Sequence, residues 1–212
     1  MFNNTYDKLS RAFFLRSNVV EIARDLVGKY LVTGKDHTLT VGRIVETEAY
    51  DGRKDHACHA YRKVTPRTEV MYREGGTAYV YLCYGIHKLF NIVTNVEGKA
   101  DAVLIRAVEP IKGIKVMRER RGNLKNPLKL TAGPGSLTVA MGIDLSYNKS
   151  LIGSDTFFIA NGEKRNIELE TDRRVGVDYA GKDAALPWRF FEIGNKYVSK
   201  PKQKPIEHGV NN

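Results

Sequence analysis

Two glutamates and a tyrosine alternate near the end of a β-prone run. Residues 38–50 are rich in Val, Ile and Thr, and strand alternation places Glu46, Glu48 and Tyr50 on one face. The run opens into a polar stretch, where a carboxylate at the strand end is well placed to meet a substrate. Glutamate on the wet face of a strand is also common, so the spacing alone leaves both a catalytic role and a solvated face open.

The polar stretch that follows, residues 51–76, carries His56, Cys58 and His59. Imidazole and thiol groups are metal ligands, but no second Cys-x-x-Cys or His-x-x-x-His cluster completes a coordination sphere. The His-x-Glu and Pro-Cys-x-x-Cys pairs of a nucleobase deaminase are also missing. We therefore expect no metal site.

Three tyrosines and a basic segment favour a nucleic-acid partner. Tyr79, Tyr81 and Tyr84 fall within six residues, and Tyr84 precedes a glycine at the expected tip of a hairpin. Residues 106–129 hold eight Lys or Arg against two Glu, a net +6 out of the chain's +10. Aromatic rings stack on bases or wedge between base steps, while Lys and Arg neutralise phosphates. Half-buried strand tyrosines and a solvated basic face would produce the same pattern, so these alternatives stay open.

Composition limits the class of protein. With 212 residues, 42% of them hydrophobic and 27% charged, the chain is typical of a globular domain. Its two cysteines cannot form a disulfide framework and suit a reducing compartment. The apolar runs are too short to cross a bilayer, and the N-terminus does not resemble a signal peptide.

The elements that must position these residues follow from local patterns. Asn18 and Glu21 form a capping box before a helix that Gly28 ends. We expect an α+β fold, a single domain over residues 1–198 on a mixed, mainly antiparallel β-sheet with peripheral helices and a protruding β-hairpin, followed by a polar, disordered tail over 199–212. The expected strands are 30–33, 38–50, 77–82, 90–94, 102–107, 156–159, 167–169 and 189–193, and the further helices are 111–121 and 136–141.

Seven blocks of the sequence resemble blocks of the alkyladenine (3-methyladenine) DNA glycosylases of the single-domain α+β type. Any one block is a weak signal, whereas seven in the family's order argue strongly against chance. Together they extend over about residues 18–198. The blocks are 42–50, 65–67, 79–87, 91–92, 103–110, 133–135 and 174–177.

The resemblance implies a monofunctional DNA glycosylase of base excision repair. Such an enzyme flips alkylated or deaminated purines out of duplex DNA and hydrolyses the N-glycosidic bond, which leaves an abasic site, and it needs no metal or organic cofactor. Glu48 matches the general base that activates water, and Arg106 matches the arginine that helps to hold this water. A guanidinium beside Glu48 makes chemical sense, because it keeps the carboxylate ionised.

The resemblance also assigns the residues that contact DNA. Tyr50, His59, Tyr81 and Asn91 match the residues of the base-binding pocket. Tyr84, with Ile86 and Met71, matches the residues of the hairpin that enters DNA. The residues that contact the DNA backbone correspond to Arg67, Arg121, Gly135 and Ser136. Electron-rich rings suit a cationic alkylated purine. Ser136 stands where family members often carry lysine, which removes a charge that would meet a phosphate.

Two other functions stay open at this point. One is a non-enzymatic nucleic-acid module that binds lesions on the same fold. The other is a metal-dependent nuclease that uses Glu46 and Glu48 with histidines of the 51–76 loop. We expect double-stranded DNA with damaged purines as the partner, no membrane, and a monomer. The expected location is cytoplasmic and nucleoid-associated in a bacterium, or nuclear in a eukaryote.

Overall fold

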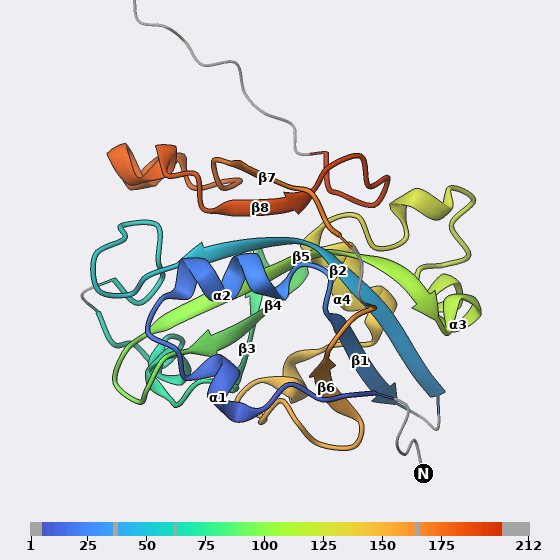
Figure 1. The fold of residues 1–212 in the computed structure, drawn as a ribbon, viewed down its shortest axis with the longest axis horizontal. Helices are drawn as coiled ribbons and strands as arrows, with labels where there is room; N and C mark the ends of the chain where they lie inside the picture. The colour runs from blue at the N-terminus through green and yellow to red at the C-terminus, as the bar shows by residue number, and fades with distance from the viewer. Residues whose placement is uncertain (1–5, 36–37, 62, 164–165, 201–212) are drawn as a thin grey trace, which may run out of the picture.

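The computed structural model describes residues 6–35, 38–61, 63–163 and 166–200 (Figure 1). A strongly curved antiparallel sheet forms its centre, and the two long strands β2 (Thr38–Tyr50) and β5 (Asp101–Lys112) pair along most of their length. The sheet order is β3-β4-β5-β2-β1-β6, and β8 joins both β2 and β7. The remaining strands are β1 (Tyr30–Lys35), β3 (Ala78–Cys83), β4 (His87–Thr94), β6 (Phe157–Ala160), β7 (Leu169–Asp172) and β8 (Arg189–Glu192). The predicted α+β class is confirmed, and each pairing between these described strands is antiparallel.

Helices lie around the sheet. The predicted capped helix is α2 (Val19–Leu26), in which the Asn18 side chain accepts from two backbone N–H groups of the first turn. Its apolar face packs on the sheet, and the Thr47 hydroxyl of β2 donates to the Ala23 carbonyl at 2.8 Å. The other helices are α1 (Arg11–Phe14), α3 (Ile114–Arg120) and α4 (Pro134–Met141), with 3-10 turns η1 (Glu69–Tyr72), η2 (Pro127–Lys129), η3 (Leu145–Tyr147) and η4 (Asp178–Ala185).

The strand predicted over 102–107 is longer than expected, and the helix predicted from residue 111 is wrong at its start. Strand β5 continues through Pro110 to Lys112, and α3 begins only at Ile114. Proline is tolerated here because β4 pairs with β5 only up to Leu104, which leaves this part of the strand paired mainly on its β2 side. The strand predicted over 167–169 is also misplaced, because β7 begins at Leu169 and runs to Asp172.

The face of β2 that carries the two glutamates is covered, not wet. Strand β8 pairs with residues 46–48 and lies alongside this part of β2, with β7 paired on to β8 (Figure 1). Glu46 and Glu48 have no exposed surface. The register of β2 against β5 shifts on both sides of Glu46, and such bulges re-aim side chains. Of the two interpretations that the spacing left open, a solvated strand face is therefore excluded.

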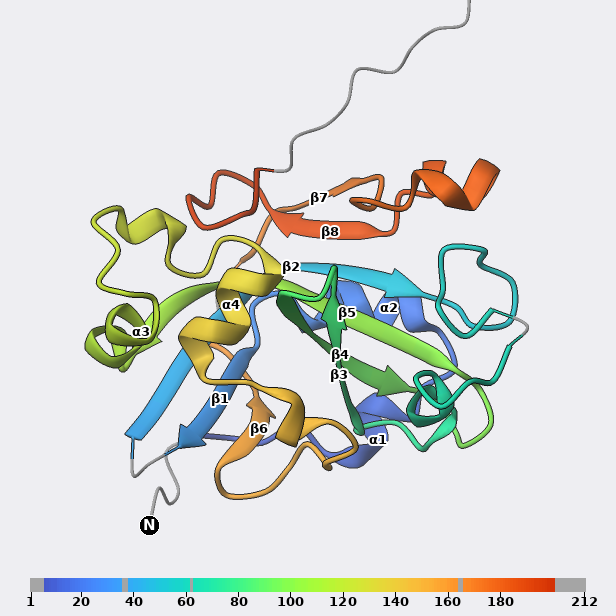
Figure 2. The ribbon, with the colours of Figure 1, turned by 180° about the vertical axis from the view of Figure 1, so that it is seen from behind.

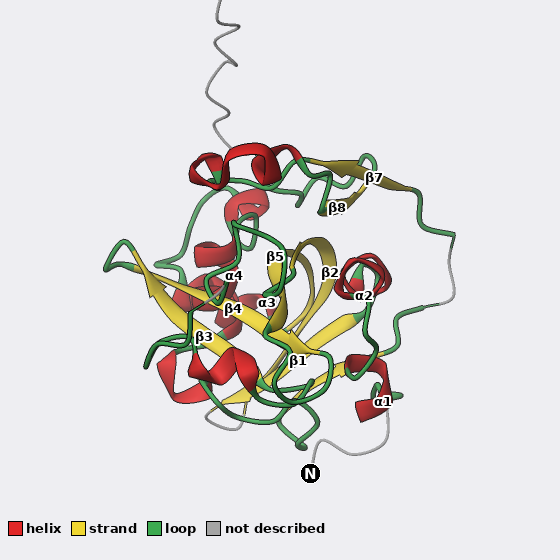
Figure 3. Ribbon diagram, turned by 90° about the vertical axis from the view of Figure 1, so that its left-hand side faces the viewer, coloured by secondary structure: helices red, strands yellow, loops and turns green. Residues whose placement is uncertain are grey.

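The β3–β4 hairpin projects from the body of the molecule, as predicted (Figure 3), and lies in front of the sheet in the view of Figure 2. Its turn places Tyr84 and Gly85 in the left-handed region, with φ of 49° and 73°. Glycine adopts this conformation without a steric penalty. The turn holds Tyr84 at the tip, where it is 88% exposed.

The packed domain reaches Ser199, one residue beyond the predicted boundary at 198. Ser199 is buried, and its backbone N–H donates to Glu46 Oε2 at 2.8 Å. The rest of the predicted disordered tail, residues 201–212, lies outside the described residues.

Candidate active site

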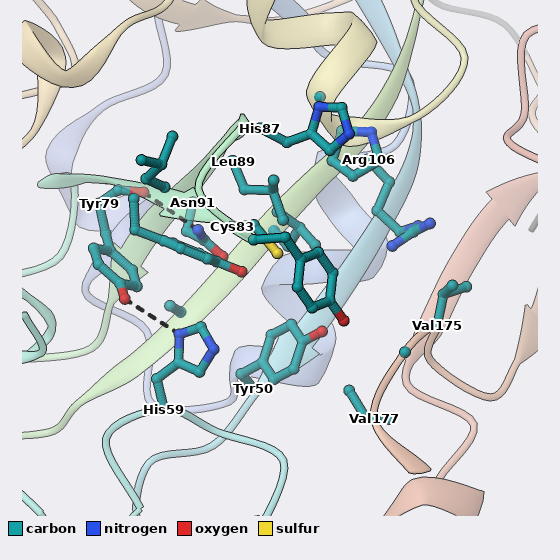
Figure 4. Close-up of a pocket in the computed structure, with 18 of the residues that line it drawn as sticks. Tyr50, His59, Tyr79, Cys83, His87, Leu89, Asn91, Arg106, Val175 and Val177 are labelled. Carbon is teal, nitrogen blue, oxygen red and sulfur yellow. Dashed lines mark hydrogen bonds between the residues drawn. The ribbon is translucent and has the colours of Figure 1, made fainter. Parts of the chain in front are cut away.

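One cavity of about 640 Å³ opens between the hairpin, the 51–67 loop, the start of α4 and the 175–179 segment. In the close-up, Arg106 and Val175 lie on one side, and Tyr79 and His59 on the other (Figure 4). Of the residues predicted for the site, the cavity lining brings together Tyr50, His59, Arg67, Met71, Tyr81, Tyr84, Asn91, Arg106, Gly135 and Ser136. Glu48, Ile86 and Arg121 are outside this lining.

Glu48 lies directly behind the cavity wall. Its carboxylate accepts a hydrogen bond from the Tyr50 hydroxyl at 2.7 Å and from the Val175 backbone N–H at 2.8 Å, and Arg106 Nη1 is 3.2 Å from Oε1. All three donors belong to cavity-lining residues. Burial and the adjacent Glu48 carboxylate raise the pKa of Tyr50 well above its usual value. Tyr50 therefore stays a neutral phenol and a hydrogen-bond donor to Glu48.

Arg106 connects the two glutamates. Its Nε donates to Glu46 Oε1 at 2.9 Å, while Nη1 faces Glu48. Burial alone would lower the pKa of Arg106, but the two carboxylates more than reverse this and raise it. The guanidinium is therefore a permanent cation beside Glu48, which is the environment that keeps a carboxylate ionised.

Aromatic rings and one arginine form the opposite wall. Tyr79 and Tyr81 stack with centroids 5.1 Å apart, and the His59 ring meets Tyr81 edge-on at 4.8 Å. His59 Nδ1 lies 3.2 Å from the Tyr79 hydroxyl. Although the His59 side chain is exposed, partial desolvation and the nearby Arg67 guanidinium lower its pKa to about 4. His59 is therefore neutral at pH 7 and presents an uncharged ring to the cavity.

Arg67 belongs to this wall. Its guanidinium carbon lies 4.7 Å from the Tyr81 ring centroid, Nε donates to the Tyr79 hydroxyl at 3.3 Å, and Nη2 is 3.2 Å from both ring nitrogens of His59. The residue is exposed. Its predicted contact with a phosphate stays a prediction, since the contacts seen here are all with side chains of the wall.

Asn91 and Met71 lie deeper in the cavity. Asn91 is 5% exposed, and its Nδ2 donates to the Tyr79 carbonyl at 3.2 Å. Met71 is buried in an apolar cluster with Val70 and Tyr79. The polar group of the predicted pocket, Asn91, is thus held in place by the backbone. Met71, which the resemblance assigns to the hairpin that enters DNA, lies in the apolar cluster beside this pocket.

Three of the four predicted backbone-contact residues, Arg121, Gly135 and Ser136, gather around the start of α4. Arg121 Nη2 donates to the Ser136 hydroxyl at 3.1 Å, which ties the end of α3 to the first turn of α4. A Cβ at Gly135 would lie 3.0 Å from the His87 ring, so glycine allows α4 to approach the hairpin closely. Ile86 is 71% exposed beside Tyr84 at the tip. The hairpin and the basic α3–α4 region therefore lie on the same side of the cavity mouth.

Comparison with known proteins identifies the family. The family model described as methylpurine-DNA glycosylase matches residues 12–196. The chain belongs to the methylpurine-DNA glycosylase family. It is 46% identical over 194 residues to a protein of Carboxydothermus hydrogenoformans named "Putative 3-methyladenine DNA glycosylase", across 91% of this chain and 98% of that protein. Proteins of the same name from Natranaerobius thermophilus and Chlamydia pneumoniae are each 44% identical, across 91% and 86% of this chain and 98% and 93% of their own length.

Several residues of this methylpurine-DNA glycosylase site were not predicted from the sequence. Tyr179 lines the cavity, is 67% exposed, and donates its hydroxyl to the Ala57 carbonyl at 3.0 Å. Arg174 makes a buried ion pair with Asp55 and lies 4.9 Å from the Tyr50 ring centroid. The family-like block 174–177 was the only signal for this wall, and nothing in its spacing assigns it to the cavity.

The described residues do not favour the nuclease alternative. Among them, no group of three His, Cys, Asp or Glu side chains is arranged to hold a metal ion. His56 instead lies 2.5 Å from Asp183 through Nδ1, and Glu46 is surrounded by arginines. None of the described helices has the length and apolar character of a membrane span.

Proposed function

We propose that this protein is a monofunctional DNA glycosylase of base excision repair, which hydrolyses the N-glycosidic bond of damaged purines flipped out of duplex DNA. The observation that carries the proposal is the position of Glu48. This ionisable carboxylate lies against Arg106 and Tyr50 at the wall of a cavity whose other wall is aromatic. A cavity of about 640 Å³ is large enough for a purine.

Glu48 is the general base of the proposed reaction. It takes a proton from water while the water oxygen attacks the sugar C1′ and the bond from C1′ to the base breaks, with the electron pair leaving on the base. A carboxylate offers about four acceptor positions, and Tyr50, Val175 and Arg106 account for three. One acceptor position is left for water. Because Glu48 has no exposed surface in the unbound protein, the cavity must adjust around the flipped nucleotide before water reaches it.

The aromatic wall supports selection of damaged purines. Tyr50, His59 and Tyr81 present rings to one cavity, and an electron-rich ring attracts a cationic alkylated base when water is excluded. A neutral His59 avoids repulsion of such a cation. The 88% exposed ring of Tyr84 is available to fill the space that the flipped nucleotide leaves. Unstacking costs a few kcal/mol and is least costly for a damaged base.

A lyase reaction does not fit the cavity. Cutting the strand through a Schiff base needs an amine nucleophile, and among the described residues no lysine lines the cavity. We therefore propose a product with an abasic site and an intact strand.

The decisive experiment measures base release. Duplexes that each carry one defined lesion (3-methyladenine, 7-methylguanine, hypoxanthine or ethenoadenine) are incubated with excess protein, then analysed with and without alkali. We expect alkali-dependent strand breaks with at least one lesion, no borohydride-trapped adduct, and no effect of a chelator. Tight lesion binding without release of any base would instead support a non-enzymatic binding module.

A further inference from the structure

A second carboxylate is buried next to the proposed catalytic one. Glu46 lies two residues before Glu48 on β2 and has no exposed surface. Its Oε1 accepts from Arg106 Nε at 2.9 Å, Arg189 Nε at 2.7 Å and the Ser199 hydroxyl at 2.8 Å, and Oε2 accepts from the Ser199 N–H at 2.8 Å. The mechanism does not use Glu46, yet burying an ionised carboxylate is costly unless it is fully paired.

We infer that Glu46 is a positioning residue for the reaction: it orients Arg106 toward Glu48 and offsets part of the positive charge around Glu48, so that Glu48 remains a sufficiently strong base. The inference rests on the proposed glycosylase function. It assigns a role to a residue that contacts neither the cavity nor, in the proposed reaction, the substrate.

The orientation follows from the shape of a guanidinium, a rigid planar fork of donors. Glu46 accepts the hydrogen bond from Arg106 Nε, and the Ser199 hydroxyl lies 3.3 Å from Arg106 Nη2. Only Nη1 remains, and it faces Glu48 at 3.2 Å. Ser199 therefore brings the C-terminal segment into the same arrangement, because it contacts both Glu46 and Arg106.

Among the described residues, ionisable side chains from three segments surround Glu48. Arg106 contacts it from β5, Tyr50 from β2, and Arg174 from the segment that also supplies the Val175 N–H. Arg174 is neutralised by its ion pair with Asp55. The buried groups that remain are two carboxylates, Glu46 and Glu48, and two guanidinium groups, Arg106 and Arg189. Arg189 also pairs with Asp172 at 3.2 Å, but Asp172 is 39% exposed, so solvent screens its charge.

Loss of the Glu46 charge leaves Glu48 as the one buried carboxylate of this set against two buried cations, with only the partly exposed Asp172 to offset Arg189. A stronger positive field favours the ionised form of Glu48 and makes it a weaker base. Burial alone would raise the pKa of Glu46, but Arg106, Arg189 and the Ser199 N–H lower it below its usual value. Glu46 therefore carries its charge throughout the neutral range.

The test is the pH dependence of single-turnover release of 7-methylguanine from a duplex. This base is a fixed cation that leaves without protonation, so the acidic limb of the rate profile reports the general base alone. For Glu46→Gln we expect the limb to move roughly one pH unit lower and the plateau rate to fall about ten-fold. Glu46→Asp, which keeps the charge, should return the limb to the parent position. Because the profile is read from active molecules, loss of folded protein lowers the amplitude without moving the limb.

Two further variants separate this role from a structural one. Glu192→Gln removes a carboxylate of β8 that pairs with Arg43 at 2.7 Å, and it should leave the limb unmoved. Arg189→Gln keeps a donor for Glu46 but removes a cation, so it should move the limb to higher pH, opposite to Glu46→Gln. The inference would be overturned, with the proposed function left standing, if the acidic limbs of the parent and Glu46→Gln coincided. It would also be overturned if Glu192→Gln moved the acidic limb as far as Glu46→Gln does. A parent protein that releases no base would overturn the proposed function itself.

Discussion

The buried charge network behind the cavity and the exposed rim in front of it are built in opposite ways. In the network, Glu46 and Glu48 have no exposed surface, and several donors from distant segments hold each carboxylate. At the rim, Tyr84 and Ile86 are 88% and 71% exposed at a hairpin tip. Proton transfer needs a geometry held by many bonds, whereas capture of a large polyanion needs groups that are still free to bind. Changes in the network should therefore affect rate and stability, and changes at the rim should affect DNA binding.

The largest effect is expected from Glu48→Gln. Glutamine keeps the shape of the side chain but cannot accept a proton from water, and removing a positioned base typically slows a reaction by about 10²-fold to 10⁴-fold. Affinity for lesion DNA should stay close to that of the parent, because ground-state contacts are kept. Single-turnover release and equilibrium binding on the same duplex check both parts. Near-normal release would remove Glu48 from the mechanism.

The next effect is on stability. Glu46 has a lowered pKa in the folded protein, so its ionised form stabilises the fold above the ordinary glutamate pKa, and this contribution is lost as the pH falls through the folded value. Breaking a buried ion pair from one side costs about 3–5 kcal/mol. We expect Glu46→Gln to lower the free energy of unfolding by roughly this amount at pH 7 and by less at acidic pH. Urea denaturation at both pH values measures the difference, and a pH-independent loss would contradict it.

At the rim, Tyr84→Ala should weaken binding to a lesion duplex and slow excision while barely changing the melting temperature. Base–aromatic stacking is worth about 1–3 kcal/mol, and the 88% exposed ring contributes little to the core. Leu151→Ala is a matched control, since Leu151 is also exposed, at 59%, and does not line the cavity. A large drop in melting temperature with normal excision would instead make Tyr84 a structural residue.

The smallest effect concerns salt. Arg121 is half-buried, and it is tied to Ser136 near the cavity mouth. If it contacts one phosphate, Arg121→Gln should reduce the slope of log K against log salt by roughly one unit for undamaged duplex. Arg11→Gln changes the net charge equally on α1, outside the cavity lining, and should leave the slope unaltered. Equal slopes for all three proteins would place Arg121 away from DNA.

Local patterns in the sequence were sufficient for much of the fold. The capping box at Asn18 predicted α2, and alternation with a Tyr-Gly turn predicted the β3–β4 hairpin, because both depend on residues a few positions apart. The family-like blocks in the sequence likewise pointed to Glu48, Arg106 and the aromatic residues. The end of β5 was mispredicted: the strand was expected to stop at residue 107 but continues through Pro110 to Lys112, because whether a proline fits depends on which edge of the strand is paired.

Only the tertiary structure decided the environment of those residues. Glu46 is bonded to Arg106, Arg189 and Ser199, which lie 60, 143 and 153 positions further along the chain. Residue spacing indicates which side chains share a face, but it carries no information on what covers that face. Strand β8 lies beside β2, and Glu46 is enclosed by the Arg189 side chain of β8 and by Ser199 of the C-terminal segment. The sequence therefore determined which groups are available for chemistry, and long-range packing decided that one glutamate meets the cavity wall while its neighbour is enclosed by arginines.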